Sequence, residues 1–154
     1  MTALALPVQG PTFLSAPRAE IGEINARFAV LGIPYGVPYT VRNVAPSVAD
    51  APRAIRERSA RFGRMLGHHD FDLEGPLATA GDLALVDCGD VPADPRDFPA
   101  SAARATEAVR GILAAGAMPI VLGGDDSVAE PFLAAWRERG PVTVVHVPGV
   151  ASQV

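Results

Sequence analysis

Short apolar runs alternate with segments of helical periodicity along most of this chain, and this alternation most restricts its fold. Each run is apolar along its whole length rather than at every second residue, which is typical of strands buried on both faces. One helical pattern separates each pair of runs, as expected for parallel strands joined by crossover helices. The predicted strands are residues 28–33, 83–88, 118–122 and 142–147. The predicted helices run from Pro52 to Phe62, from Ser101 to Ala115, and from Val128 through Trp136 to a stop at Gly140-Pro141. The pattern therefore predicts an α/β domain whose parallel sheet is covered by helices.

The segment before the first strand has a different character. Residues 1–27 include Pro7, Pro11 and Pro17 and show no sustained period, so we interpret them as an irregular N-terminal arm. Residues 28–154 carry the alternating pattern and are expected to form one α/β domain. A chain of this length is long enough to bury a substantial core.

Charge and composition argue against several classes of function. The formal net charge is −4 and the arginines are scattered among acids, which does not resemble a nucleic-acid-binding surface. The longest apolar stretch, Ile112–Leu122, contains Gly116 and Pro119 and is too short to cross a bilayer. The N-terminus has no basic segment before its few apolar residues, so we expect no signal peptide. A single cysteine, Cys88, cannot form an internal disulfide, and a cytoplasmic location is expected.

Loops rich in glycine, proline and aspartate follow the carboxyl ends of the predicted strands. In open α/β sheets, ligands bind beyond the carboxyl ends of the strands. The sequence therefore places a candidate site at this edge of the sheet. The loops concerned are residues 34–43, 89–97 and 123–127, together with the segment from residue 148.

The most informative loop reads Gly-Gly-Asp-Asp-Ser, residues 123–127, between a predicted strand and a predicted helix. Its simplest interpretation is a helix cap, because Asp and Ser are favoured at that position. An anion site at the helix N-terminus is an alternative. However, Asp125 and Asp126 would repel a phosphate, and no lysine follows them.

Four blocks of the chain, in order and with matching spacing, resemble the ureohydrolase family, which includes arginases and agmatinases. FAVLGIPYGVPYT resembles the first strand and loop of that family, and APRAIRERS resembles its first helix. LVDCGDVPADP resembles a later strand and turn, and AVRGILAAGAMPIVLGGDDSV resembles the block that usually ends in G-G-D-H-S. The resemblance covers about four-fifths of the chain and favours an agmatinase-like N-terminal half.

The resemblance implies a three-layer α/β/α fold, of which this chain would form part, with two Mn²⁺ ions at the carboxyl edge of the sheet. In the family, the two ions activate a bridging water that attacks a guanidinium carbon and releases urea and an amine. The implied substrate is a linear amidine or guanidino compound such as agmatine. Asp126 stands where the family motif has a histidine ligand, so it is the one candidate metal ligand. An aspartate could ligate Mn²⁺ through a carboxylate oxygen in place of the histidine nitrogen.

The next metal-binding block of the family, D-A-H-x-D, is not matched by this chain. Pro148, Val150 and Ser152 stand where the three ligands are expected. Proline and valine have no donor atom in their side chains. We therefore expect the chain alone to lack catalysis, and the sequence identifies no catalytic or substrate-binding residue. A non-catalytic ureohydrolase-like subunit is the alternative function, and we expect association with a second copy or a homologous subunit.

Other polar residues admit simpler interpretations. His68 and His69 point in different directions on any regular element, so a solvated loop is preferred to a metal site. His146 lies within a predicted strand and is expected in the core or behind the site, where it would not ligate metal. Asp87 and Asp90 flank a strand end and are expected to form local hydrogen bonds.

The remaining residues of interest are a cysteine, several aromatics and an asparagine. Cys88 is expected to behave as a small core residue, and Trp136 to belong to the apolar stripe of its helix. Tyr35, Tyr39 and Asn43 lie in the first loop at the candidate site. Contact with either a substrate or another subunit is open for these three.

Overall fold

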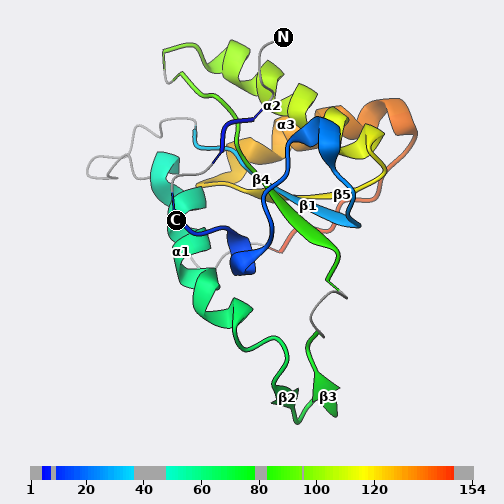
Figure 1. Ribbon diagram of the computed structural model, residues 1–154. Coiled ribbons are helices and arrows are strands. Elements are labelled where there is room, and N and C mark those ends of the chain that lie inside the picture. The colour runs from blue at the N-terminus through cyan, green and yellow to red at the C-terminus, as the bar shows by residue number, and fades with distance from the viewer. Residues whose placement is uncertain (1–4, 8–9, 37–47, 79–82, 95, 148–154) are drawn as a thin grey trace, which may run out of the picture.

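A parallel sheet between helical layers organises the molecule. The computed structural model describes residues 5–7, 10–36, 48–78, 83–94 and 96–147. The sheet has three strands in the order β4-β1-β5. These are β1 (Phe28–Gly32), β4 (Leu85–Asp90) and β5 (Met118–Leu122). The long helices are α1 (Ala51–Gly63), α2 (Phe98–Ala114) and α3 (Ala129–Trp136). Helices α2 and α3 cover one face, and α1 lies on the other side with Phe13 and Leu14 of the N-terminal segment (Figure 1). The predicted three-layer α/β/α architecture is confirmed.

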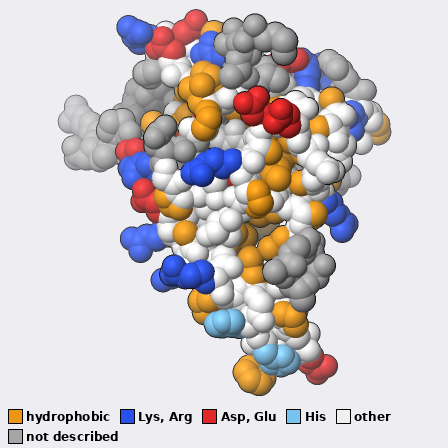
Figure 2. Space-filling model, viewed as in Figure 1, with side chains coloured by type: hydrophobic (Ala, Val, Ile, Leu, Met, Phe, Trp, Pro, Cys, Tyr) orange, Lys and Arg blue, Asp and Glu red, His pale blue; other side chains and the backbone are white. Residues whose placement is uncertain are grey.

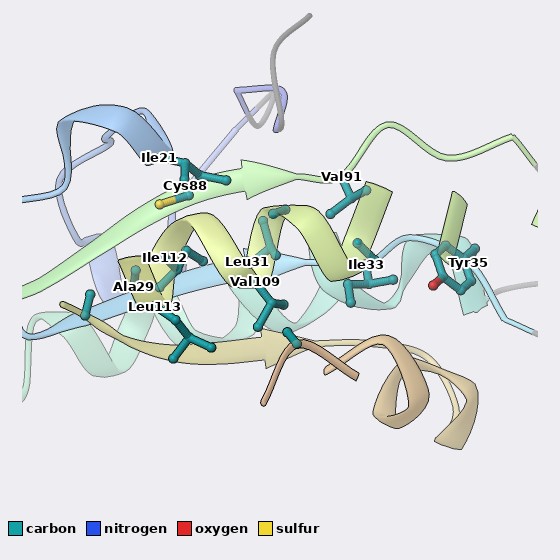
Figure 3. Close-up of a cluster of buried hydrophobic side chains, with 14 residues drawn as sticks. Ile21, Ala29, Leu31, Ile33, Tyr35, Cys88, Val91, Val109, Ile112 and Leu113 are labelled. Carbon is teal, nitrogen blue, oxygen red and sulfur yellow. The ribbon is translucent and has the colours of Figure 1, made fainter. Parts of the chain in front are cut away.

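The larger hydrophobic core lies between the sheet and α2. Ala29, Leu31 and Ile33 are fully buried on this face of β1, and α2 packs Val109 and Ile112 against it (Figure 3). Alternate residues of a strand point to the same face, which explains the spacing on β1. Helix α2 begins after Asp97, whose side chain accepts a hydrogen bond from the Ala100 N–H at 3.1 Å. This cap and the apolar stripe place α2 as the sequence predicted, with its start three residues earlier.

A smaller core covers the opposite face of the sheet. Val30, Leu85 and Leu122 are buried there and contact Phe13 and Leu14 of the N-terminal segment. That segment includes the short 3₁₀ helices η1 (Phe13–Ser15) and η2 (Ile21–Glu23). The N-terminal segment is thus part of the packed structure, while the division of the chain at residue 28 stays a prediction.

Helix α1 has a different buried face from the one its sequence indicated. The helical pattern of its sequence runs through Ile55, Ser59 and Phe62. Ile55 is 37% exposed and Phe62 45% exposed, whereas Arg56 is only 1% exposed and Ser59 is buried. An ion-paired arginine therefore takes the central inward position, which an apolar pattern cannot reveal.

The N-terminal segment also hydrogen-bonds the outer edge of β4. Leu6 and Asp90 exchange two backbone hydrogen bonds of 2.7 and 2.9 Å. The Asp87 N–H donates to Pro17 at 2.8 Å, and the Asp87 carbonyl accepts from Ala19 at 3.2 Å. These bonds satisfy backbone groups that an edge strand would otherwise expose.

The predicted fourth strand, Val142–Val147, does not form. Residues 141–147 follow α3 and the short helix η5 (Arg137–Arg139) without pairing to any described strand. Val145 and Val147 are each 84% exposed. His146 is exposed too, so its expected place inside the core is wrong. A run of β-branched residues indicates strand propensity, but a strand also needs a neighbour to pair with.

Candidate functional site

The carboxyl ends of the three parallel strands lie at one edge of the sheet. Gly32 of β1 is in register with both Asp90 of β4 and Leu122 of β5. The chain after β1 continues through Tyr35, and the chain after β5 enters the 123–127 turn. The sequence therefore predicted correctly that these loops share one edge.

The Gly-Gly-Asp-Asp-Ser turn is packed closely against a neighbouring loop. A Cβ on Gly124 would lie 2.5 Å from the carbonyl oxygen of Val48, so a side chain at this position would clash. Asp125 then caps the short 3₁₀ helix η4 (Asp126–Val128), because its Oδ1 accepts the Ser127 N–H at 3.0 Å. The Ser127 hydroxyl donates to the same oxygen at 2.5 Å. The Ser127 amide is thus already bonded within the turn, and the cap that the sequence indicated is present.

Two buried polar atoms near this turn have no hydrogen-bond partner. These are Oδ2 of Asp125 and the hydroxyl of Tyr35. Oδ2 lies against the backbone of Gly36, where an added Cβ would come within 2.2 Å of it. Burial, then the charges of Glu130 and Asp125, raise the pKa of Tyr35 to about 12. The Tyr35 ring packs edge-on against Phe98 with centroids 5.2 Å apart, so the phenol is a neutral, fixed component of this edge.

Asp126, the candidate metal ligand, is exposed at the start of η4. Its neighbour Asp125 is committed through one oxygen to the cap. Among the residues that the structure describes, no group of three or more His, Cys, Asp or Glu side chains could hold a metal ion. The donors present therefore do not fit a two-manganese centre, which requires several carboxylate or imidazole ligands around each ion.

A buried ion-pair network lies beneath the same edge, and sequence reasoning did not find it. The Arg56 guanidinium donates to both oxygens of Asp87, at 2.8 and 2.9 Å, and to Asp90 Oδ1 at 2.6 Å. It also donates to the carbonyl of Gly89 at 3.0 Å. The Arg56 and Asp87 side chains are 1% and 0% exposed. The expectation that Asp87 and Asp90 form local bonds in a turn was too narrow, because their principal partner comes from α1.

Further donors complete the network around Asp87. The Phe13 N–H donates to Asp87 Oδ2 at 2.8 Å, and the Gly89 N–H donates to Oδ1 at 3.0 Å. Burial alone would lower the pKa of Arg56, but its hydrogen bonds and ion pairs with the two aspartates raise that pKa overall. This network ties α1, β4 and the N-terminal segment together, and it fixes Asp90 at the carboxyl end of β4.

His68 and His69 do not form a metal site with their neighbours. His69 belongs to β2 (His69–Asp70), which pairs antiparallel with β3 (Gly75–Pro76) in a small projecting hairpin (Figure 1). Both histidines are exposed, and Figure 2 shows imidazoles on the surface of this lower part of the molecule. The tip carries Phe71, which is 88% exposed. Their expected exposure is confirmed, although the segment is a hairpin rather than a plain loop.

Several other residues can now be placed. Cys88 is buried as predicted, and burial followed by the charge of Asp87 raises the pKa of its thiol to about 11. Trp136 is partly buried against the larger core. The remaining residues weighed for the site lie outside the described residues: Tyr39, Asn43, Pro148, Val150 and Ser152.

No helix in the described part of the chain is long and apolar enough to cross a membrane. This agrees with the sequence, in which the longest apolar stretch is interrupted by Gly116 and Pro119.

The family model described as the Arginase family matches residues 26–148. A mitochondrial agmatinase from Gallus gallus is 33% identical over 94% of this chain and 40% of its own length. A mitochondrial guanidino acid hydrolase from Homo sapiens is 33% identical over 77% of this chain and 32% of its own length. The chain thus spans well under half the length of these relatives.

Solved structures show the same likeness. Proclavaminate amidino hydrolase from Streptomyces clavuligerus superposes with a TM-score of 0.66 at 28% identity, over 86% of this chain and 40% of that protein. A Trypanosoma cruzi formiminoglutamase with Mn²⁺ gives a TM-score of 0.64 at 26% identity, over 85% of this chain and 42% of that protein.

Proposed function

This chain belongs to the arginase family, and from that premise we propose that it is the N-terminal part of an agmatinase-like ureohydrolase. The activity of the whole protein would be hydrolysis of a linear guanidino or amidine substrate to urea and an amine. One observation carries the proposal. The Gly-Gly-Asp-Asp-Ser turn lies at the carboxyl edge of β5, within a region that the family model matches.

The described residues supply a scaffold and a single exposed candidate ligand, Asp126. Asp125 is held in the turn by Ser127, and Asp90 is held by Arg56. These bonds leave Asp126 as the exposed carboxylate of the 123–127 turn. Hydrolysis would therefore need further carboxylate or imidazole ligands beyond those described. We propose that residues 1–154 alone do not release urea.

The test measures Mn²⁺ binding by calorimetry and urea release with agmatine and with guanidinobutyrate. We expect no urea from the chain alone. Asp126→Asn and Asp126→His are compared with Asp72→Asn, a matched control because Asp72 is an exposed acid on the hairpin, away from the turn. Manganese-dependent urea release that is lost in Asp126→Asn but kept in Asp72→Asn would refute the claim of an incomplete site.

A second candidate is a non-catalytic subunit that binds a full-length relative. It is favoured by the lack, among the described residues, of any group of side chains able to hold a metal ion. The measurement is light scattering of mixtures with a full-length agmatinase. A stable mixed oligomer without any change in urea release would support this candidate, and an unchanged mixture of separate species would exclude it.

A cytoplasmic location remains part of the proposal. It rests on the single cysteine, Cys88, which is buried and free, as is usual in a reducing compartment. Fractionation of cells that express a tagged protein would test it, and recovery in an organelle or membrane fraction would contradict it.

A further inference from the structure

The projecting hairpin of β2 and β3 carries several large apolar side chains that are exposed. Phe71 is 88% exposed, and Leu73 and Leu77 are 62% and 60% exposed. Phe62 in the last turn of α1 and Met65 just after that helix are 45% and 49% exposed. Figure 2 shows apolar side chains on this lower part of the molecule. A single exposed apolar residue is ordinary, but a cluster of large ones marks an interaction surface. We call these five side chains the hairpin surface.

The tip of the hairpin is held in its shape by contacts within the hairpin. Strands β2 and β3 pair antiparallel, and Asp70 Oδ1 accepts the N–H groups of Asp72 and Leu73 at 2.9 and 3.1 Å. The His69 ring packs edge-on against Phe71, with centroids 4.9 Å apart. The fold therefore builds an element that presents its apolar side chains outward.

The sheet and its helical layers do not cover this surface. In the sequence the hairpin lies between α1 and β4, and β4 is at the opposite edge of the sheet from β5. Figure 1 shows the hairpin projecting beyond the sheet, on the far side from α2 and α3. The hairpin surface is therefore open to a partner in a way that the two faces of the sheet are not.

The charges around the hairpin surface are segregated by sign. Three arginines lie at its base, in α1 or just after it, and three acids lie in the hairpin itself. No ion pair within the described part of the chain involves any of the six. The arginines are Arg58, Arg61 and Arg64, and the acids are Asp70, Asp72 and Glu74.

This distribution of charge is complementary to itself. If two hairpins lie side by side in opposite directions about a two-fold axis, the base of each meets the tip of the other. The arginines of each copy then face the acids of the other, and Phe71 of one copy meets Phe62 and Met65 of the other. A two-fold contact uses the same patch on both copies and closes on itself. An anionic membrane or an acidic peptide would suit the arginines, but the three acids would repel it. The charges therefore favour a second copy as the occupant.

We propose that the hairpin surface joins two copies of this chain by antiparallel, two-fold packing of their hairpins. The aromatic and aliphatic side chains supply most of the affinity, as buried apolar anchors do at protein interfaces. The opposed charges fix the direction in which the two hairpins pack. This inference is independent of the proposed hydrolase activity, because the 123–127 turn takes no part in the contact.

The first test is analytical ultracentrifugation of the 154-residue chain over a wide range of concentration. We expect a monomer–dimer equilibrium that the double variant Phe71→Ser, Leu73→Ser weakens at least about tenfold, since it removes two apolar anchors. Both side chains are exposed in one copy, so the variant should fold, which circular dichroism verifies. Val145→Ser is the matched control, because Val145 is 84% exposed and lies outside any described strand.

A second test reverses the charges at either end of the hairpin surface. One variant combines Arg61→Glu with Arg64→Glu, and the other combines Asp72→Arg with Glu74→Arg. Each variant alone should be monomeric, because like charges then meet at both ends of the contact. An equimolar mixture of the two should form a heterodimer, because each altered end then faces the opposite charge.

Several results would overturn the proposal. They are a chain that stays monomeric at every concentration, a dimer that the Phe71→Ser, Leu73→Ser variant leaves unchanged, and charge variants that do not recover association when mixed. A monomer that instead floats with phosphatidylserine vesicles would also overturn it, because the occupant would then be an anionic membrane.

Discussion

Removal of the Arg56 guanidinium should destabilise this fold more than removal of any surface arginine. Arg56→Met keeps much of the apolar stem of the side chain. It removes the hydrogen bonds that the guanidinium donates to Asp87, Asp90 and Gly89. Asp87, whose side chain is 0% exposed, would keep only the N–H donors of Phe13 and Gly89. An unpaired buried charge of this kind costs about 3–5 kcal/mol.

The cost should come mainly from Asp87, because Asp90 is 29% exposed and water can replace its partner. Arg53→Met is the matched control on the same helix. Arg53 pairs with Asp50 and Glu57, but its side chain is 54% exposed. Water screens exposed ion pairs, so this control should change stability little.

The assay is urea unfolding followed by circular dichroism and by the fluorescence of Trp136, the only tryptophan. With a slope of about 1–3 kcal/mol per molar urea, Arg56→Met should lower the midpoint by about 1 M or more. Adding Asp87→Leu to Arg56→Met should recover part of the loss, since no buried charge then lacks a partner. A loss below about 1 kcal/mol, or one equal to that of Arg53→Met, would refute the reasoning.

Three other positions give predictions that the same preparations can test. Gly32→Ala should lower the free energy of unfolding by about 1–3 kcal/mol in urea, because the added Cβ would lie 1.8 Å from Asp90 Oδ1. The control Gly22→Ala should lower it much less, because nothing lies within 4 Å of a Cβ at that position. Equal losses in the two variants would contradict this. Cys88, with a pKa raised to about 11, should react with a thiol reagent at neutral pH only after urea unfolds the chain, and rapid native labelling would contradict its burial. Because the folded-state pKa of Tyr35 is raised from 10.0 to about 12, its contribution to stability is complete below pH 10 and is lost as pH rises towards 12. Tyr35→Phe should therefore reduce the loss of stability over that interval, and identical pH profiles of unfolding would contradict this.

The inward face of a strand or helix was predicted correctly where its buried side chains are apolar. The runs at β1 and β5 and the stripe on α2 record burial directly, because their inward residues are apolar apart from Ser101 of α2. Strand β4 was also predicted, although it begins and ends two residues later than its apolar run. The later end occurs because Asp90 is part of the strand, where Arg56 and the N-terminal segment bond its polar groups.

What the sequence did not reveal depends on pairing between distant residues. The inward place of Arg56 follows from two aspartates more than thirty positions away. The packing of residues 5–7 and 10–18 follows from the edge of β4, which no local period encodes. The segment 142–147 shows the reverse case, since it has strand propensity but no described neighbour that completes a ladder. Strand propensity and apolar patterns describe residues without their distant neighbours. The position of Arg56, the packing of the N-terminal segment and the pairing of a strand each depend on a residue elsewhere in the chain.

The contrast between local patterns and distant contacts also explains why a short motif can indicate where a site lies but not supply all of its ligands. Gly124 and Asp125 are fixed by contacts within or next to the turn, so their five-residue motif is enough to predict the sharp turn and the cap. A metal centre differs because its ligands must converge from several loops, and the described residues bring Asp126 close to no sufficient set of donors. The position of the Gly-Gly-Asp-Asp-Ser turn therefore supports the arginase family's scaffold at this edge, while hydrolysis by these residues alone would require ligands that a single turn cannot provide.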